Sequence, residues 1–166
     1  MFNIKELKLG RANWVKVAGI VSSRLGWTLE DCEETSPKDI AKIRKWMEAV
    51  KQGLVIKADG KRTSGSGLLL CGQPGHGKST LAVSIIQEML TTFPVEAFNP
   101  PENAPLVRPC YFSTFNEVVK LRGLMMEDHT DNEEALYYGI LGDCDNDAYN
   151  IRVLVIDDVG VVVTVT

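Results

Sequence analysis

One eight-residue stretch limits the folds open to this 166-residue chain more than any other feature. Residues 72–79 read Gly-Gln-Pro-Gly-His-Gly-Lys-Ser and match G-x-x-x-x-G-K-[ST], the pattern of a phosphate-binding loop. Glycines let such a loop wrap closely around an anion and turn its backbone N–H groups inward. The lysine adds a positive charge at the β- and γ-phosphates, and the hydroxyl that follows it can ligate Mg²⁺. The pattern therefore predicts a site for a nucleoside triphosphate.

The residues on either side of the motif agree with this prediction, because a phosphate-binding loop connects a strand to a helix. Residues 68–71, Leu-Leu-Leu-Cys, predict a short buried strand, and residues 80–90 carry apolar side chains at helical spacing. His76 occupies a variable position of the loop, so we interpret it as a tolerated side chain and not as a catalytic group. The predicted ligand-binding residues are Gly72, Gln73, Pro74, Gly75, His76, Gly77, Lys78, Ser79 and Thr80.

A second motif lies near the other end of the chain. Residues 153–156 are Val-Leu-Val-Ile and are followed by Asp157 and Asp158, which fits a Walker B strand. Such a strand places Asp157 at its tip, where a carboxylate can hold Mg²⁺ through water, and leaves Asp158 placed to polarise an attacking water. We therefore predict Ser79 and Asp157 as metal ligands and Lys78 and Asp158 as catalytic residues.

Strand and helix signals alternate between the two motifs. Residues 110–112 predict a strand, and Thr114 and Glu117 fit a capping box that opens a helix. Residues 127–134 are acidic and turn-prone, so we interpret them as a solvated loop, and residues 134–141 predict a short helix. Buried strands that alternate with helices predict an α/β fold with a parallel sheet.

Charge is distributed unevenly along the chain. Residues 1–66 hold 13 Lys and Arg against 8 Asp and Glu, a balance of +5, whereas residues 67–166 hold 5 against 14, a balance of −9. The N-terminal excess suits an acidic partner or a phosphate backbone, and equally a solvated basic face without a partner. Ser36 can cap a helix, so we place the predicted nucleotide-binding domain at 36–166. Residues 1–35 are then a basic segment for a partner or for DNA.

Composition excludes several other classes. With 45% hydrophobic and 24% charged residues, the chain has the usage of an ordinary globular protein and not of a disordered or collagen-like one. No apolar run approaches the ~18 residues of a membrane span, and the first residues lack the apolar core of a secretory signal. The four cysteines, Cys32, Cys71, Cys110 and Cys144, have no spacing typical of a zinc site or a disulfide framework. We therefore expect a cytoplasmic protein without a membrane partner.

Residues 67–79 and 154–160 resemble the ATPase domain of the DnaC/IstB-like proteins, which are helicase loaders and transposition helpers of the AAA+ class. Residues 111–122, from Tyr-Phe-Ser-Thr into Glu-Val-Val-Lys-Leu-Arg, are similar to the same family, as is the paired Asp157 and Asp158. The resemblance implies a P-loop NTPase fold of the AAA+/ASCE type, a parallel sheet flanked by helices. It also implies ATP and Mg²⁺ as ligands, a replicative helicase and single-stranded DNA as partners, and a homo-oligomer as one assembly state.

The chain departs from the family pattern after Asp158, where only eight residues follow. The family continues with a sensor strand, which lies between the two motif strands, and with an arginine finger. We therefore expect a fold that is incomplete at the C-terminus and an ATPase whose hydrolysis is impaired.

Three other functions compete with this ATPase. A nucleotide-binding fragment that does not hydrolyse its ligand is the strongest of them. A GTPase switch would use residues 157–160 as D-x-x-G, but the guanine-reading Asn-Lys-x-Asp motif is absent from the sequence. A small kinase would need a basic lid, and residues 123–151 contain no Lys or Arg.

Overall fold

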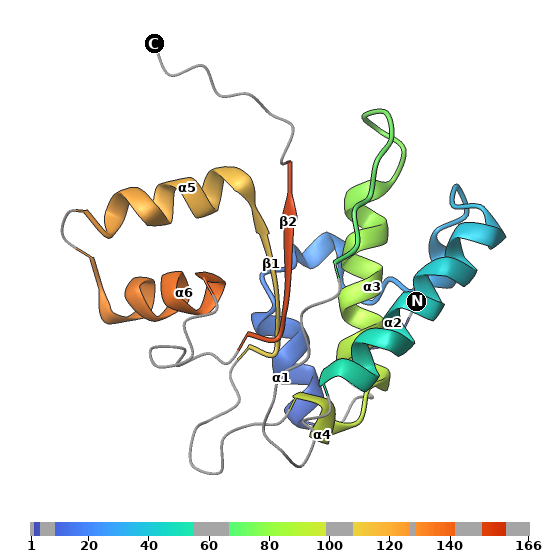
Figure 1. Cartoon of the computed structure of the whole chain (residues 1–166), viewed down its shortest axis with the longest axis horizontal. Coiled ribbons are helices and arrows are strands. Elements are labelled where there is room, and N and C mark those ends of the chain that lie inside the picture. Colours follow the sequence, from blue (N-terminus) through green and yellow to red (C-terminus); the bar gives the residue numbers. More distant parts are fainter. Residues whose placement is uncertain are drawn as a thin grey trace.

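The computed structural model of the chain describes residues 2–3, 9–54, 67–98, 108–126, 129–141 and 151–158. These residues form an α/β arrangement in which helices surround a small parallel sheet (Figure 1). The α-helices are α1 (Leu9–Val17), α2 (Pro37–Leu54), α3 (Lys78–Thr92), α4 (Val95–Phe98), α5 (Phe115–Leu124) and α6 (Asp131–Leu141). The strands are β1 (Cys110–Thr114) and β2 (Val153–Asp157), and two short 3₁₀ turns are η2 (Ser22–Arg24) and η3 (Leu29–Asp31).

The two strands pair in parallel, with Cys110 opposite Val153 and Thr114 opposite Asp157. This pairing confirms both strand predictions and their orientation. The other edge of β1 is met by the chain that follows α1, because the Phe112 amide donates a hydrogen bond of 2.8 Å to the Ala18 carbonyl. Parallel strands end at the same edge of a sheet, so Thr114 and Asp157 lie side by side at the carboxyl edge.

The predicted strand at residues 68–71 is wrong. This segment has no strand assignment, Leu69 is 83% exposed, and Cys71 is exposed instead of buried. A strand needs a neighbour whose backbone completes its hydrogen bonds, and within the described residues β1 and β2 pair only with each other. Leu70 alone of the apolar run packs against the core. The apolar composition of residues 68–71 predicted a buried strand. The described sheet offers this segment no strand to pair with.

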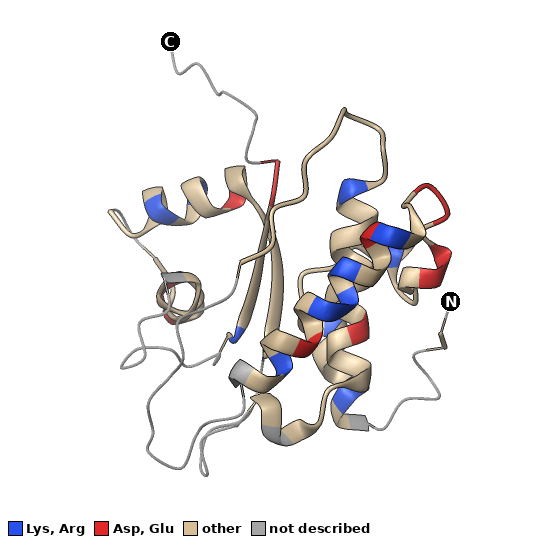
Figure 2. Ribbon diagram, turned by 45° about the vertical axis from the view of Figure 1, so that its right-hand side comes forward, with Lys and Arg blue, Asp and Glu red and all other residues tan. Residues whose placement is uncertain are grey.

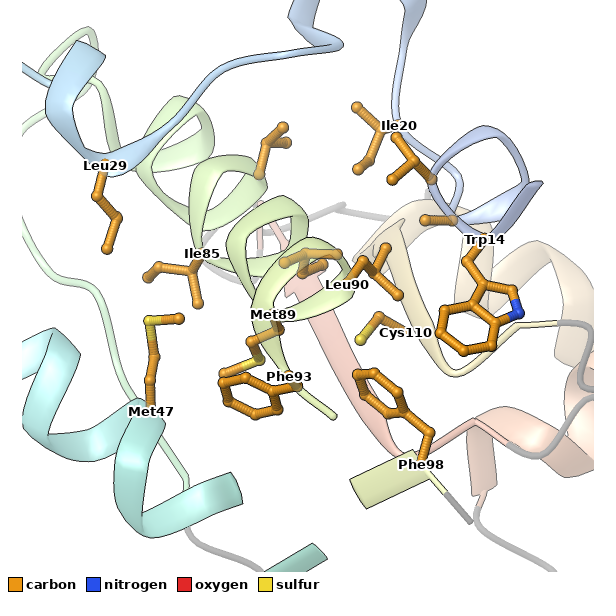
Figure 3. Packing of buried hydrophobic residues seen from close by; sticks show 14 of the residues in the cluster. Trp14, Ile20, Leu29, Met47, Ile85, Met89, Leu90, Phe93, Phe98 and Cys110 are labelled. Carbon is orange, nitrogen blue, oxygen red and sulfur yellow. The ribbon is translucent and has the colours of Figure 1, made fainter. Parts of the chain in front are cut away.

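Helix α3 is the centre of the hydrophobic core (Figure 3). Nine of its residues are buried, which is why its sequence is apolar on almost every side. Trp14 of α1 is buried and packs edge-on against Phe98 of α4, with ring centroids 5.6 Å apart. The cluster draws on α1, η3, α2, α3, α4 and β1, and includes Val15, Ala18, Leu29, Met47, Ile86, Met89, Leu90, Phe93 and Cys110.

The helix caps follow short-range signals in the sequence. The Thr114 hydroxyl accepts from the Glu117 amide at 3.2 Å, and the Glu117 carboxylate accepts from the Thr114 amide at 2.8 Å, which confirms the predicted capping box. A second box joins Thr130 and Glu133 in the same way. It starts α6 at Asp131, earlier than predicted, so the acidic residues from 131 onward form the first turn of a helix and not a loop. Acidic side chains are favourable there because they face the positive end of the helix dipole.

Residues on both sides of position 35 share the core, because α1 and the turn at η3 pack on α3. The division into segments 1–35 and 36–166 stays a prediction. None of the described helices is long and apolar enough to cross a lipid bilayer.

Candidate nucleotide-binding site

The glycine-rich loop leads directly into the first turn of α3. Gly77 is the N-cap and has left-handed backbone angles, φ 67° and ψ 9°, and Gly75 has φ 82°. Glycine adopts this conformation at little cost because it lacks a Cβ. The Gly77 carbonyl accepts the first helical hydrogen bond, from the Leu81 amide at 2.8 Å. The helix therefore begins at Lys78, two residues before the predicted span of 80–90, with its positive end directed at the loop.

Lys78 folds back over the loop that precedes it. Its Nζ donates a hydrogen bond of 2.7 Å to the carbonyl of Gln73. The position that a Cβ would take on Gly72 lies 3.8 Å from the Lys78 Cδ atom, so the side chain passes close to both ends of the turn. Residues 71–76 are exposed, and Ser79 and Thr80 are half-buried in the first turn of α3. The predicted residues 72–80 thus comprise an exposed loop and the first turn of α3, with the Lys78 side chain lying over the loop.

The two acidic residues lie at the carboxyl end of β2. Asp157 is the last residue of the strand and Asp158 follows it with φ 57°, the one left-handed non-glycine residue in the described chain. The Asp157 Oδ1 atom accepts a hydrogen bond of 3.0 Å from the Asp158 amide. Aspartate is among the few non-glycine residues that adopt this conformation readily. Asp157 is half-buried and Asp158 is exposed.

The loop and the acidic strand end lie at the same end of the molecule. β2 packs beside α3, and the two elements run in opposite directions, so the C-terminus of β2 and the N-terminus of α3 point the same way (Figures 1 and 2). The two motifs lie on separate elements of the sequence, and the packing of β2 on α3 brings these elements together.

The structure adds one residue that the sequence did not single out. The Glu34 Oε2 atom lies 3.6 Å from the position that a Cβ would take on Gly77, so its carboxylate stands at the cap of α3. Figure 2 shows this acidic turn, which precedes α2, beside the N-terminal end of α3. An acidic composition at residues 29–34 was visible in the sequence, but no spacing rule links it to the loop at residues 72–77.

Several contacts hold the acidic turn against α3. The guanidinium of Arg44 on α2 forms ion pairs with Glu30 of η3 and with Glu88 of α3. The Cys32 Sγ atom lies 3.5 Å from the hydroxyl of the buried Ser84, and burial raises the pKa of the Cys32 thiol. Burial also raises the pKa of the Glu88 carboxyl, which the nearby Arg44 charge opposes. Glu34 thus lies close to two residues, Glu30 and Cys32, whose contacts hold the turn against α3.

Two of the predicted residues carry oxygen donors of the kind that Mg²⁺ prefers. Mg²⁺ prefers oxygen ligands and is usually held by one or two side chains together with the phosphates of its substrate. Ser79 and Asp157 supply a hydroxyl and a carboxylate of this kind. Within the described ranges, the His, Cys, Asp and Glu side chains form no group of three or more able to hold a metal ion unaided.

Comparison of the chain with protein-family models, with curated proteins and with solved structures found no match.

Proposed function

We propose that the chain is a P-loop protein that binds ATP with Mg²⁺ at residues 72–80. The observation that carries the proposal is the loop itself: a G-x-x-x-x-G-K-[ST] motif with left-handed glycines at 75 and 77, placed at the N-terminus of a buried helix. Such an arrangement is suited to an anion because backbone N–H groups and the helix dipole act together.

Four of the predicted residues have a stated role in the proposed binding. The Lys78 ammonium would leave the Gln73 carbonyl and bind the β- and γ-phosphates, and Ser79 and Asp157 would hold Mg²⁺ directly or through water. Bound Mg²⁺ would neutralise charge on the phosphates. Asp158 would orient water, but it is exposed, and a carboxylate surrounded by solvent gives little electrostatic preorganisation. We therefore propose binding as the main activity and slow hydrolysis as the minor one.

The experiment is a calorimetric titration of the full chain with Mg·ATP. We expect saturable binding that Lys78→Ala abolishes and that Lys38→Ala leaves intact, because Lys38 is an exposed residue of α2. Both substitutions remove one positive charge, so the pair separates a local contact from a change in net charge. Equal binding by Lys78→Ala and the unmodified chain would contradict the proposal. A parallel titration with Mg·GTP tests the GTPase alternative.

For the biological role, we propose an AAA+ protein of the DnaC/IstB-like kind, which acts in the cytoplasm with a replicative helicase and single-stranded DNA. The support is the resemblance at the two motifs and the +5 balance of residues 1–66. Lys and Arg residues recur along α2 (Figure 2), although Lys42 pairs with Asp39 and Lys51 with Glu48. Binding to single-stranded DNA should weaken steeply with added salt. Absence of binding, or binding insensitive to salt, would count against this role.

A further inference from the structure

We propose that Glu34 makes the loop discriminate between forms of the nucleotide by their charge, and so favours Mg·ATP over metal-free ATP. This inference rests on the proposed function, because it concerns the ligand of the same loop. It goes beyond it by assigning a specificity-determining role to a residue outside both motifs.

The first step is the position of the carboxylate. The Glu34 Oε2 atom lies 3.6 Å from the Cβ position of Gly77, at the N-cap of α3. The positive end of a helix attracts negative charge, so the carboxylate occupies a favourable place at the N-cap. Lys78 does not compete for it, because the lysine Nζ donates to the Gln73 carbonyl.

The second step is the anchoring of the turn that carries Glu34. Arg44 ties Glu30 to α3, and Cys32 lies against Ser84 of α3. Thr28 also donates hydrogen bonds to Asp31 from its amide, at 2.8 Å, and from its hydroxyl, at 2.7 Å. The backbone of the turn is therefore held, and the exposed Glu34 side chain extends from it to the N-cap of α3.

The third step is the effect of this fixed charge on an anionic ligand. Two unit charges about 6 Å apart in a water-like dielectric repel each other by an amount that changes affinity about threefold. Metal-free ATP carries about two more negative charges than Mg·ATP, since the metal ion brings two positive charges. Glu34 should therefore lower the affinity for metal-free ATP about three- to tenfold more than the affinity for Mg·ATP at low salt.

The experiment compares the affinity of ATP with excess Mg²⁺ and with a chelator, for the unmodified chain, Glu34→Gln and Glu34→Lys. Glu33→Gln is the matched control, since it removes the same charge from the adjacent exposed position. We expect Glu34→Gln to raise the affinity for metal-free ATP about three- to tenfold more than the affinity for Mg·ATP. Glu34→Lys should increase this difference further. This gain in affinity should shrink as added salt screens the charge. Glu33→Gln should give a smaller gain in affinity than Glu34→Gln.

Each other result overturns the inference. Equal effects on the two ATP forms, or no effect, would show that Glu34 does not sense ligand charge. Weaker binding in Glu34→Gln would show that Glu34 contacts the nucleotide or its metal favourably. If neither the unmodified chain nor Glu34→Gln shows binding that depends on Lys78, the proposed function fails and the inference fails with it. Lys78-dependent binding without a Glu34 effect removes the inference alone.

Discussion

Replacement of Gln87 by methionine tests how the N-terminal part of the chain is held to the central helix. Gln87 is fully buried on α3. Its Oε1 atom accepts from the Gly26 amide at 2.7 Å, and its Nε2 atom donates to the Arg24 carbonyl at 2.9 Å. Both polar atoms of the Gln87 amide thus bind backbone groups of residues 24–26 and hold this segment to the core.

The expected cost can be worked out from these two contacts. Methionine has a similar volume and a similar helix propensity, so neither a cavity nor a helix penalty adds to it. The buried Gly26 amide loses its acceptor, which costs about 1–3 kcal/mol, and the second bond contributes about 1 kcal/mol. The sum is about 2–4 kcal/mol, less some gain from the apolar side chain. For a chain of this length, that corresponds to a fall in Tm of about 4–16 °C.

Urea and thermal unfolding followed by circular dichroism measure the effect, and amide hydrogen exchange at Gly26 locates it. Gln52→Met is the matched control: Gln52 is exposed on α2 and bonds only to Glu48, at 3.3 Å. It should change the free energy of unfolding by less than about 0.5 kcal/mol. If Gln87→Met also changed the free energy of unfolding by less than about 0.5 kcal/mol and left the Gly26 amide protected from exchange, the two hydrogen bonds would not hold this segment.

Three further predictions concern the backbone, acid stability and turnover. Gly19→Ala should cost about 2–4 kcal/mol in urea unfolding, because φ is 77° and the new Cβ would lie 2.3 Å from a backbone oxygen of β1; Gly10→Ala, with nothing within 4 Å, is its control. A backbone hydrogen bond lowers the pKa of Glu117 below its ordinary 4.5, so its stabilisation is complete above that pH and is lost as pH falls through the lower folded value. Glu117→Gln should therefore flatten the loss of stability in acid, and an unchanged acid profile would contradict this sign. ATP turnover should stay below about 1 s⁻¹, the low end of ordinary enzymes, and Lys78→Ala should remove it; faster turnover would show that the exposed Asp158 is well placed after all.

Local signals predicted those parts of the fold that depend on neighbours in sequence. The helix at α2 starts at Pro37 after Ser36, whose hydroxyl accepts from the Asp39 amide at 3.2 Å, as capping rules require. The strand β2 was recognisable from four apolar residues and its acidic end. The start of α6 was missed because Thr130 stands in an acidic run that hid its capping box.

Contacts between distant residues could not be predicted in this way. The apolar run at residues 68–71 indicated burial, but periodicity does not say which strand would pair with it, and within the described sheet none does. The loop of the site followed from spacing alone, because its chemistry is set by eight consecutive residues. The nearness of Glu34 to Gly77 depends on the packing of η3 and α2 against α3, which no short motif encodes.

The burial of α3 has a thermodynamic consequence for any ligand of the loop. Residues 81–90 of this helix form the centre of the core, and its first turn is the end of the loop, so the loop geometry exists only when the core is folded. A ligand that requires this geometry binds the native state and not the unfolded chain. At a free concentration one hundred times its Kd, it would add about 2.7 kcal/mol to the free energy of unfolding. The melting temperature of the whole chain is therefore a direct gauge of occupancy at a loop of eight residues.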